Sequence, residues 1–156
     1  MSLNGNKIRE HIMLLRFLRD AFFMLAAMGV FRIFVGAIGV PESIGTWISS
    51  GTLLAMILAV YYGQSAPSHG FDRFWHFILI GWLISVAESI VVIGAILVTT
   101  NLRLANYFSS ERVSVKQHIV GHLGSAIGGN MTIPLVVLAG IGFVIGRKLA
   151  FKSQSA

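Results

Sequence analysis

Apolar positions along the chain gather into long blocks that are separated by short polar segments. Four blocks are long enough for a membrane-crossing helix, and they cover residues 21–40, 46–63, 74–98 and 123–146. A helix needs about 20 mainly apolar residues to cross the hydrocarbon core of a bilayer. The pattern therefore predicts an all-α integral membrane protein, in which residues 1–156 form a single membrane domain built as a bundle of four transmembrane helices.

The polar links predict how these helices connect. The segment VPESIG, residues 40–45, is short and carries a proline, so we expect the first two spans to form a tight antiparallel hairpin. The link at residues 99–118 is the longest and most polar of the three, and we expect it to be an outer loop.

Basic residues predict the orientation of the chain. They are concentrated before the first span and after the last, at Lys7, Arg9, Arg16, Arg19, Arg147, Lys148 and Lys152. By the positive-inside rule, both termini then face the cytoplasm. The outer loop carries Arg103, Arg112 and Lys116 against this rule, but the ends outnumber it by seven to three. The membrane expected is a plasma membrane or a bacterial inner membrane.

The N-terminal residues 1–20 allow two interpretations. In KIREHIMLLRFLRD, residues 7–20, apolar side chains alternate with charged ones. This pattern fits an amphipathic helix in the headgroup zone, or a helix that extends the first span into the cytoplasm. A simple basic cytoplasmic flank fits as well.

Composition supports the membrane class and removes several kinds of chemistry. Only 12% of the residues are charged, against about 25% in a typical soluble domain. The absence of cysteine excludes thiolate catalysis, disulfides and cysteine-ligated metals. The net charge of +6 is explained by orientation and by anionic lipid headgroups, so we expect the lipid bilayer and no nucleic acid as a partner.

Two charged residues, Arg32 and Glu88, fall inside apolar blocks. Their positions in the first and third spans differ in depth by about 4–5 Å, at 1.5 Å per helical residue. A lone charge at this depth costs at least about 2.5–3.5 kcal/mol, so both should face a helix–helix contact. We expect an intramembrane charged pair, which either fixes the register of two helices or serves a transport pathway.

A second polar stripe enters the fourth span. On a continuous helix, small and polar residues share one face at His118, His122, Ser125, Gly129 and Thr132. The segment Gly-Gly-Asn, which ends at Asn130, precedes Pro134 and predicts a bend.

Three interpretations of this stripe stay open. It is a packing face with a polar entrance, an outward-open cleft leading toward Glu88, or a metal or haem site on His118 and His122. Histidines at positions i and i+4 can share a metal, but the glutamate of the zinc protease motif does not follow His118.

The sequence carries no phosphate-binding loop and no nucleophile elbow, which argues against an enzyme. The leading functional prediction is a small multi-pass membrane subunit, either self-associating or accessory to a larger membrane complex. The alternative is a homo-oligomeric transporter, exchanger or channel that uses Glu88 as its coupling group. A metal- or haem-binding membrane protein comes third, and the sequence itself requires no cofactor.

Overall fold

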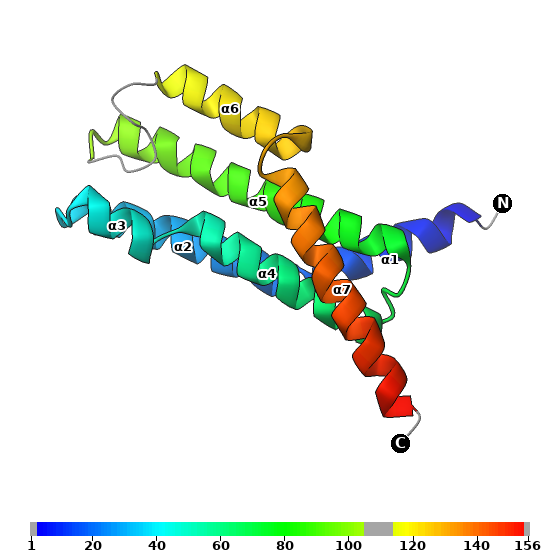
Figure 1. The fold of residues 1–156 in the computed structure, drawn as a ribbon. Coiled ribbons are helices and arrows are strands. Elements are labelled where there is room, and N and C mark those ends of the chain that lie inside the picture. Colours follow the sequence, from blue (N-terminus) through cyan, green and yellow to red (C-terminus); the bar gives the residue numbers. More distant parts are fainter. Residues whose placement is uncertain (1–2, 105–113, 155–156) are drawn as a thin grey trace.

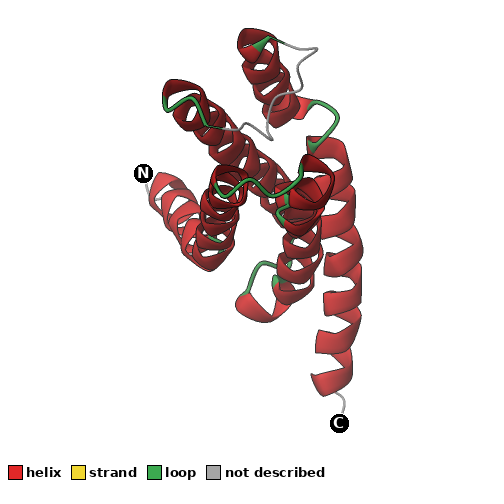
Figure 2. Ribbon diagram, turned by 90° about the vertical axis from the view of Figure 1, so that its left-hand side faces the viewer, coloured by secondary structure: helices red, strands yellow, loops and turns green. Residues whose placement is uncertain are grey.

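The computed structural model describes residues 3–104 and 114–154, and this part of the chain is helical with no strand (Figures 1 and 2). The helices are α1 (Leu3–Phe17), α2 (Arg19–Ala37), α3 (Glu42–Ile48), α4 (Gly51–Ser65), the 3-10 turn η1 (Pro67–His69), α5 (Phe74–Asn101), α6 (Val115–Gly128) and α7 (Thr132–Gln154).

The prediction of an all-helical chain with four long apolar helical stretches is confirmed. Four helical stretches are long and apolar enough to cross a membrane: Arg19–Ala37, Glu42–Ser65, Phe74–Asn101 and Val115–Phe151. The last of them begins eight residues before the predicted start at residue 123, because the polar first turns of α6 are also helical. The side of the membrane on which each terminus lies stays a prediction.

The N-terminal helix α1 continues into α2 almost without interruption (Figure 1). The amide of Leu18 donates to the carbonyl of Leu14 at 3.0 Å, and the amide of Phe22 donates to Leu18 at 3.1 Å. Leu14 and Leu18 are both buried against the bundle. The residues of α1 therefore form a helical extension of the first span.

Two of the spans are broken helices. In the second, α3 ends at Ile48 and α4 begins at Gly51, where the Ser50 hydroxyl caps the new helix by accepting from the Leu53 amide at 3.2 Å. The buried Ser49 hydroxyl donates back to the Gly45 carbonyl, so the polar groups at this break are satisfied locally.

The fourth span breaks between Gly128 and Thr132, where a bend was predicted. Gly128 has a φ of +156°, and a Cβ on Gly129 would lie 2.8 Å from the Cα of Ser125. Both positions therefore favour glycine. The continuous helix assumed for the polar stripe is wrong, since Thr132 opens a second helix, α7.

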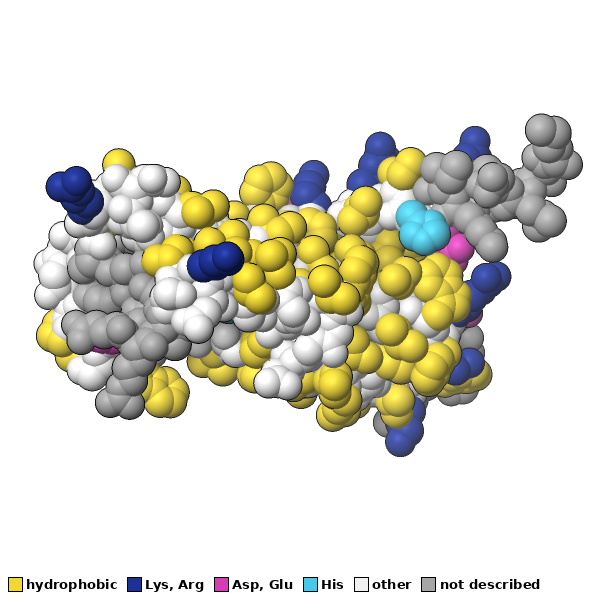
Figure 3. Space-filling model, turned by 90° about the horizontal axis from the view of Figure 1, so that it is seen from above, with side chains coloured by type: hydrophobic (Ala, Val, Ile, Leu, Met, Phe, Trp, Pro, Cys, Tyr) yellow, Lys and Arg dark blue, Asp and Glu magenta, His cyan; other side chains and the backbone are white. Residues whose placement is uncertain are grey.

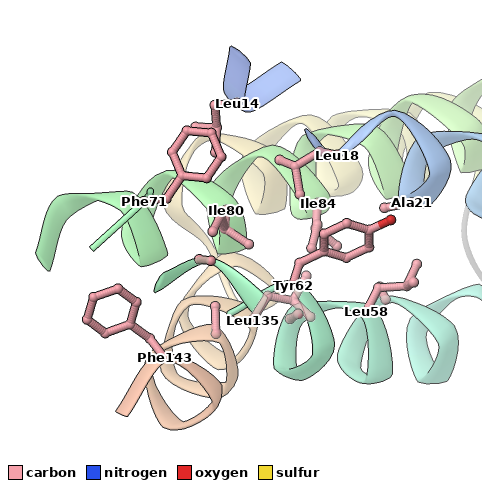
Figure 4. Packing of buried hydrophobic residues seen from close by; sticks show 14 of the residues in the cluster. Leu14, Leu18, Ala21, Leu58, Tyr62, Phe71, Ile80, Ile84, Leu135 and Phe143 are labelled. Atoms are coloured by element: carbon pink, nitrogen blue, oxygen red, sulfur yellow. The ribbon is translucent and has the colours of Figure 1, made fainter. Parts of the chain in front are cut away.

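The core lies where α4, α5 and α7 meet the end of α1 and the start of α2 (Figure 4). It contains Leu18, Leu58, Tyr62, Ile84 and Leu135, all of them buried. This apolar core fills the half of the bundle that was predicted to face the cytoplasm.

Glycines allow α4 and α7 to touch through their backbones. A Cβ on Gly142 would lie 2.2 Å from the carbonyl oxygen of Val60, and a Cβ on Gly146 would lie 1.9 Å from that of Gln64. On the other helix, a Cβ on Gly63 would lie 2.1 Å from the carbonyl oxygen of Ala139. The sequence signal for this glycine seam is the small-xxx-small spacing of GFVIG, residues 142–146.

Candidate functional site

Glu88 lies on α5 and is only 3% exposed, as expected for a charged residue that faces the protein interior. Its Oε1 accepts a hydrogen bond from the hydroxyl of Thr52, at the start of α4, at 3.4 Å. Its Oε2 is buried, with no hydrogen-bond partner in the part of the chain that the structure describes. Burying a carboxyl oxygen without a hydrogen-bond partner is energetically costly, which makes Glu88 a candidate functional group.

Arg32 lies on α2 and shares a cavity of about 20 Å³ with Glu88. This volume is close to that of one water-sized probe. The remaining lining is supplied by Leu25, Met28, Gly29, Ser49, Gly51, Val91 and Val92. The structure therefore brings the two charges predicted to face a helix contact to the same place.

Arg32 and Glu88 line this cavity without a direct ion pair between them in the part of the chain that the structure describes. In the described ranges, Arg19 and Asp20 form an ion pair at 3.0 Å, and a contact of the same length joins Glu10 to His76. That Arg32 and Glu88 act as an intramembrane charged pair stays a prediction.

The two histidines of the fourth span lie on the inward side of α6. Their rings stack with centroids 5.3 Å apart and planes 13° apart. The Nδ1 atoms of His118 and His122 are both buried, with no hydrogen-bond partner among the described residues. The two histidines therefore add buried polar nitrogens to α6, the helix that packs on α5.

The rest of the predicted polar stripe, from Ser125 to Thr132, stabilises the break between α6 and α7. The Thr132 hydroxyl donates to the carbonyl of Ser125 and lies 2.9 Å from the hydroxyl of Ser85 on α5. Ser85 and Thr132 are both buried, whereas Asn130 is exposed at the break. These hydrogen bonds give Ser125 and Thr132 a structural role at the break.

The described residues contain no group of three or more histidine, aspartate or glutamate side chains that could hold a metal ion. His118 and His122 thus provide two nitrogen ligands, whereas a stable zinc site uses three or four protein ligands. Residues 105–113, which contain Glu111 and form part of the outer loop predicted at 99–118, lie outside the described residues.

At the opposite end of the bundle, sequence reasoning missed a second polar contact. The His76 Nε2 lies 3.0 Å from the Glu10 Oε1, and its Nδ1 accepts from the Arg73 amide at 3.1 Å. Because Nδ1 is an acceptor, Nε2 carries the proton that it donates to Glu10. The contact fastens α1 to the start of α5. No sequence signal indicates it, since the two residues are 66 positions apart.

Comparison of the chain with protein-family models, with curated proteins and with solved structures found no match. The site is therefore interpreted from its own chemistry. It contains the buried carboxyl group of Glu88, which shares a cavity with Arg32, and the histidines His118 and His122 on α6.

Proposed function

We propose that this protein is a small multi-pass membrane subunit, whose helix α6 packs against another membrane helix, from a second copy or from a different subunit. The proposal rests on α6 itself. This helix has 14 residues and none of them is buried, although its inward side packs on α5. Seen from the side of α6, hydrophobic side chains cover much of the molecule (Figure 3).

The outward side of α6 has the pattern of a helix-packing face. Exposed glycines follow one another at Gly121, Gly124 and Gly128, beside the exposed side chains of Val120, Leu123 and Ile127. A Cβ placed on Gly121 or Gly124 would meet nothing within 4 Å. Small residues at such spacing let two helix backbones approach closely in a membrane.

Within the same chain, the glycine seam between α4 and α7 shows what such a face does when it has a partner. There, Gly142 and Gly146 leave no room for a Cβ. A glycine costs about 0.5–1 kcal/mol relative to alanine inside a helix, so exposed glycines at helical spacing are best explained by a contact with another chain.

Disulfide cross-linking tests this proposal cleanly, because the chain contains no cysteine. We expect Gly124→Cys, in native membranes under mild oxidation, to cross-link to a second copy or to a partner carrying a cysteine. The control is Ile57→Cys on α4, whose side chain is 58% exposed but which lies beside no glycine stripe. Native mass spectrometry of gently released wild-type protein then identifies the partner by its mass.

A second variant covers a partner that lacks a cysteine. Gly124→Leu should abolish the complex, whereas Val120→Leu, which adds one methylene to an exposed side chain of the same helix, should leave it intact. A monomeric wild-type protein, or a complex that survives Gly124→Leu unchanged, would refute the proposal.

The buried carboxyl group favours a second candidate function, a small homo-oligomeric transporter, exchanger or channel. In this function, His118 and His122 form the outer vestibule and Glu88 is the coupling group. Its support is the unpartnered Oε2 of Glu88 beside Arg32 and a cavity that holds about one water molecule.

Flux measurements in proteoliposomes separate the two functions. Glu88→Gln removes the charge at nearly constant size and can still accept from Thr52. We expect it to stop a proton- or cation-coupled flux, while Glu42→Gln, at the exposed start of α3, preserves it. A flux that is unchanged by Glu88→Gln would eliminate this candidate.

A further inference from the structure

A groove of about 1000 Å³ opens between the first turns of α5 and the second half of α7. The two helices meet closely where a Cβ on Gly81 would lie 2.5 Å from the Cα of Val136. Beyond this contact α7 runs away from the start of α5 (Figure 1). Gly140 lies in the groove, where a Cβ would come within 3.2 Å of the ring of Phe77.

The wall of this groove is apolar along its length and basic at one end. Phe74, Phe77, Ile141 and Val144 line the apolar part, whereas Arg147 and Lys148 line the end nearest the C-terminus. Both basic side chains are exposed, and no acidic residue belongs to the lining. The groove, as lined by the described residues, therefore combines an apolar wall with a positively charged end.

The dimensions of the groove match one leaflet of a bilayer. Its lining residues on α7 extend from Val137 to Arg147, which corresponds to about 15 Å of helix at 1.5 Å per residue. This length is half of the hydrocarbon core, which is about 30 Å thick. An acyl chain beginning at the basic end would reach the bilayer midplane near Val137.

We propose that this groove binds an anionic phospholipid, with an acyl chain along Phe77, Gly140 and Val144 and with the phosphate between Arg147 and Lys148. A basic pocket between membrane helices selects anionic headgroups, whereas an apolar groove alone would accept any lipid. The proposal is independent of the function of α6 and of Glu88, because the groove lies on other faces of the bundle.

The test measures the affinity of detergent-solubilised, delipidated protein for dioleoylphosphatidylglycerol and for dioleoylphosphatidylcholine by native mass spectrometry. We expect the wild-type protein to prefer the anionic lipid. The double variant Arg147→Gln/Lys148→Gln should lose roughly fivefold in this preference for each charge removed. The control Arg9→Gln/Arg16→Gln removes two exposed arginines of α1 and should keep the preference.

Gly140→Leu provides an independent measurement, since it fills the apolar part of the groove and leaves both basic residues in place. It should weaken the binding of both lipids, and an unchanged melting temperature verifies that the variant is folded. Equal affinity of the wild-type protein for the two lipids would overturn the proposal. So would equal losses in the two double variants, or a folded Gly140→Leu variant that binds both lipids as well as the wild-type protein does.

Discussion

The glycine seam between α4 and α7 allows the sharpest prediction about how the bundle is held together. In the variant Gly146→Ala, the new Cβ would lie 1.9 Å from the carbonyl oxygen of Gln64. This distance is about 1.5 Å short of the separation at which ordinary van der Waals contact begins. The obstructing atom belongs to the backbone, so no side-chain rotation relieves the clash and the two helices must separate.

Overpacking of this kind costs about 1–3 kcal/mol. For a chain of this size, each kcal/mol lowers the melting temperature by about 2–4 °C, so we expect Gly146→Ala to melt about 2–12 °C below the wild-type protein. The assay is thermal unfolding in a mild detergent, followed by tryptophan fluorescence and by the fraction that stays monodisperse in size-exclusion chromatography.

The matched control is Gly94→Ala on α5, where a Cβ would meet nothing within 4 Å. This variant makes the same chemical change in a helix and should melt at or slightly above the wild-type temperature, since alanine favours helices. If Gly146→Ala and Gly94→Ala melted together, α4 and α7 would not pack through their backbones, and the reasoning would be refuted.

Three further predictions concern the polar contacts and the helix break. Thr132→Val leaves the buried Ser85 hydroxyl without its partner and should destabilise the fold by about 1–3 kcal/mol in thermal unfolding, whereas Thr132→Ser keeps the contact and most of the stability. Glu10→Ala removes the partner of His76, so hydrogen exchange in residues 9–17 should rise about tenfold, and the same effect in Glu42→Ala would contradict this. Gly129→Ala places a Cβ 2.8 Å from the Cα of Ser125 and should lower the melting temperature, unlike Gly121→Ala, which meets open space.

The sequence alone was sufficient to predict an all-helical chain with four long apolar stretches. Transfer of a segment into a bilayer depends on the summed hydropathy of about 20 consecutive residues, which is a local property. The same logic predicted that Arg32 and Glu88 face the interior, because a charge exposed to lipid is costly wherever the other helices lie. The bend before Pro134 was predictable as well, since glycine and proline act on their own backbone.

The tertiary structure decided which helix faces pack against one another. The candidate site depends on Thr52 and Ser49 from a break in the second span, and nothing in the local pattern links them to Glu88. The contact between Glu10 and His76 joins residues that are far apart in sequence, and only the docking of α1 brings them together.

The glycines show most clearly why the packing of the helices could not be predicted from the sequence. Gly121, Gly124 and Gly128 on α6 have the same kind of spacing as Gly142 and Gly146 on α7. One set lies open on the surface, and the other is pressed against the backbone of α4. Periodicity determines that a helix has a small-residue face, but the partner of that face depends on the packing of the whole bundle.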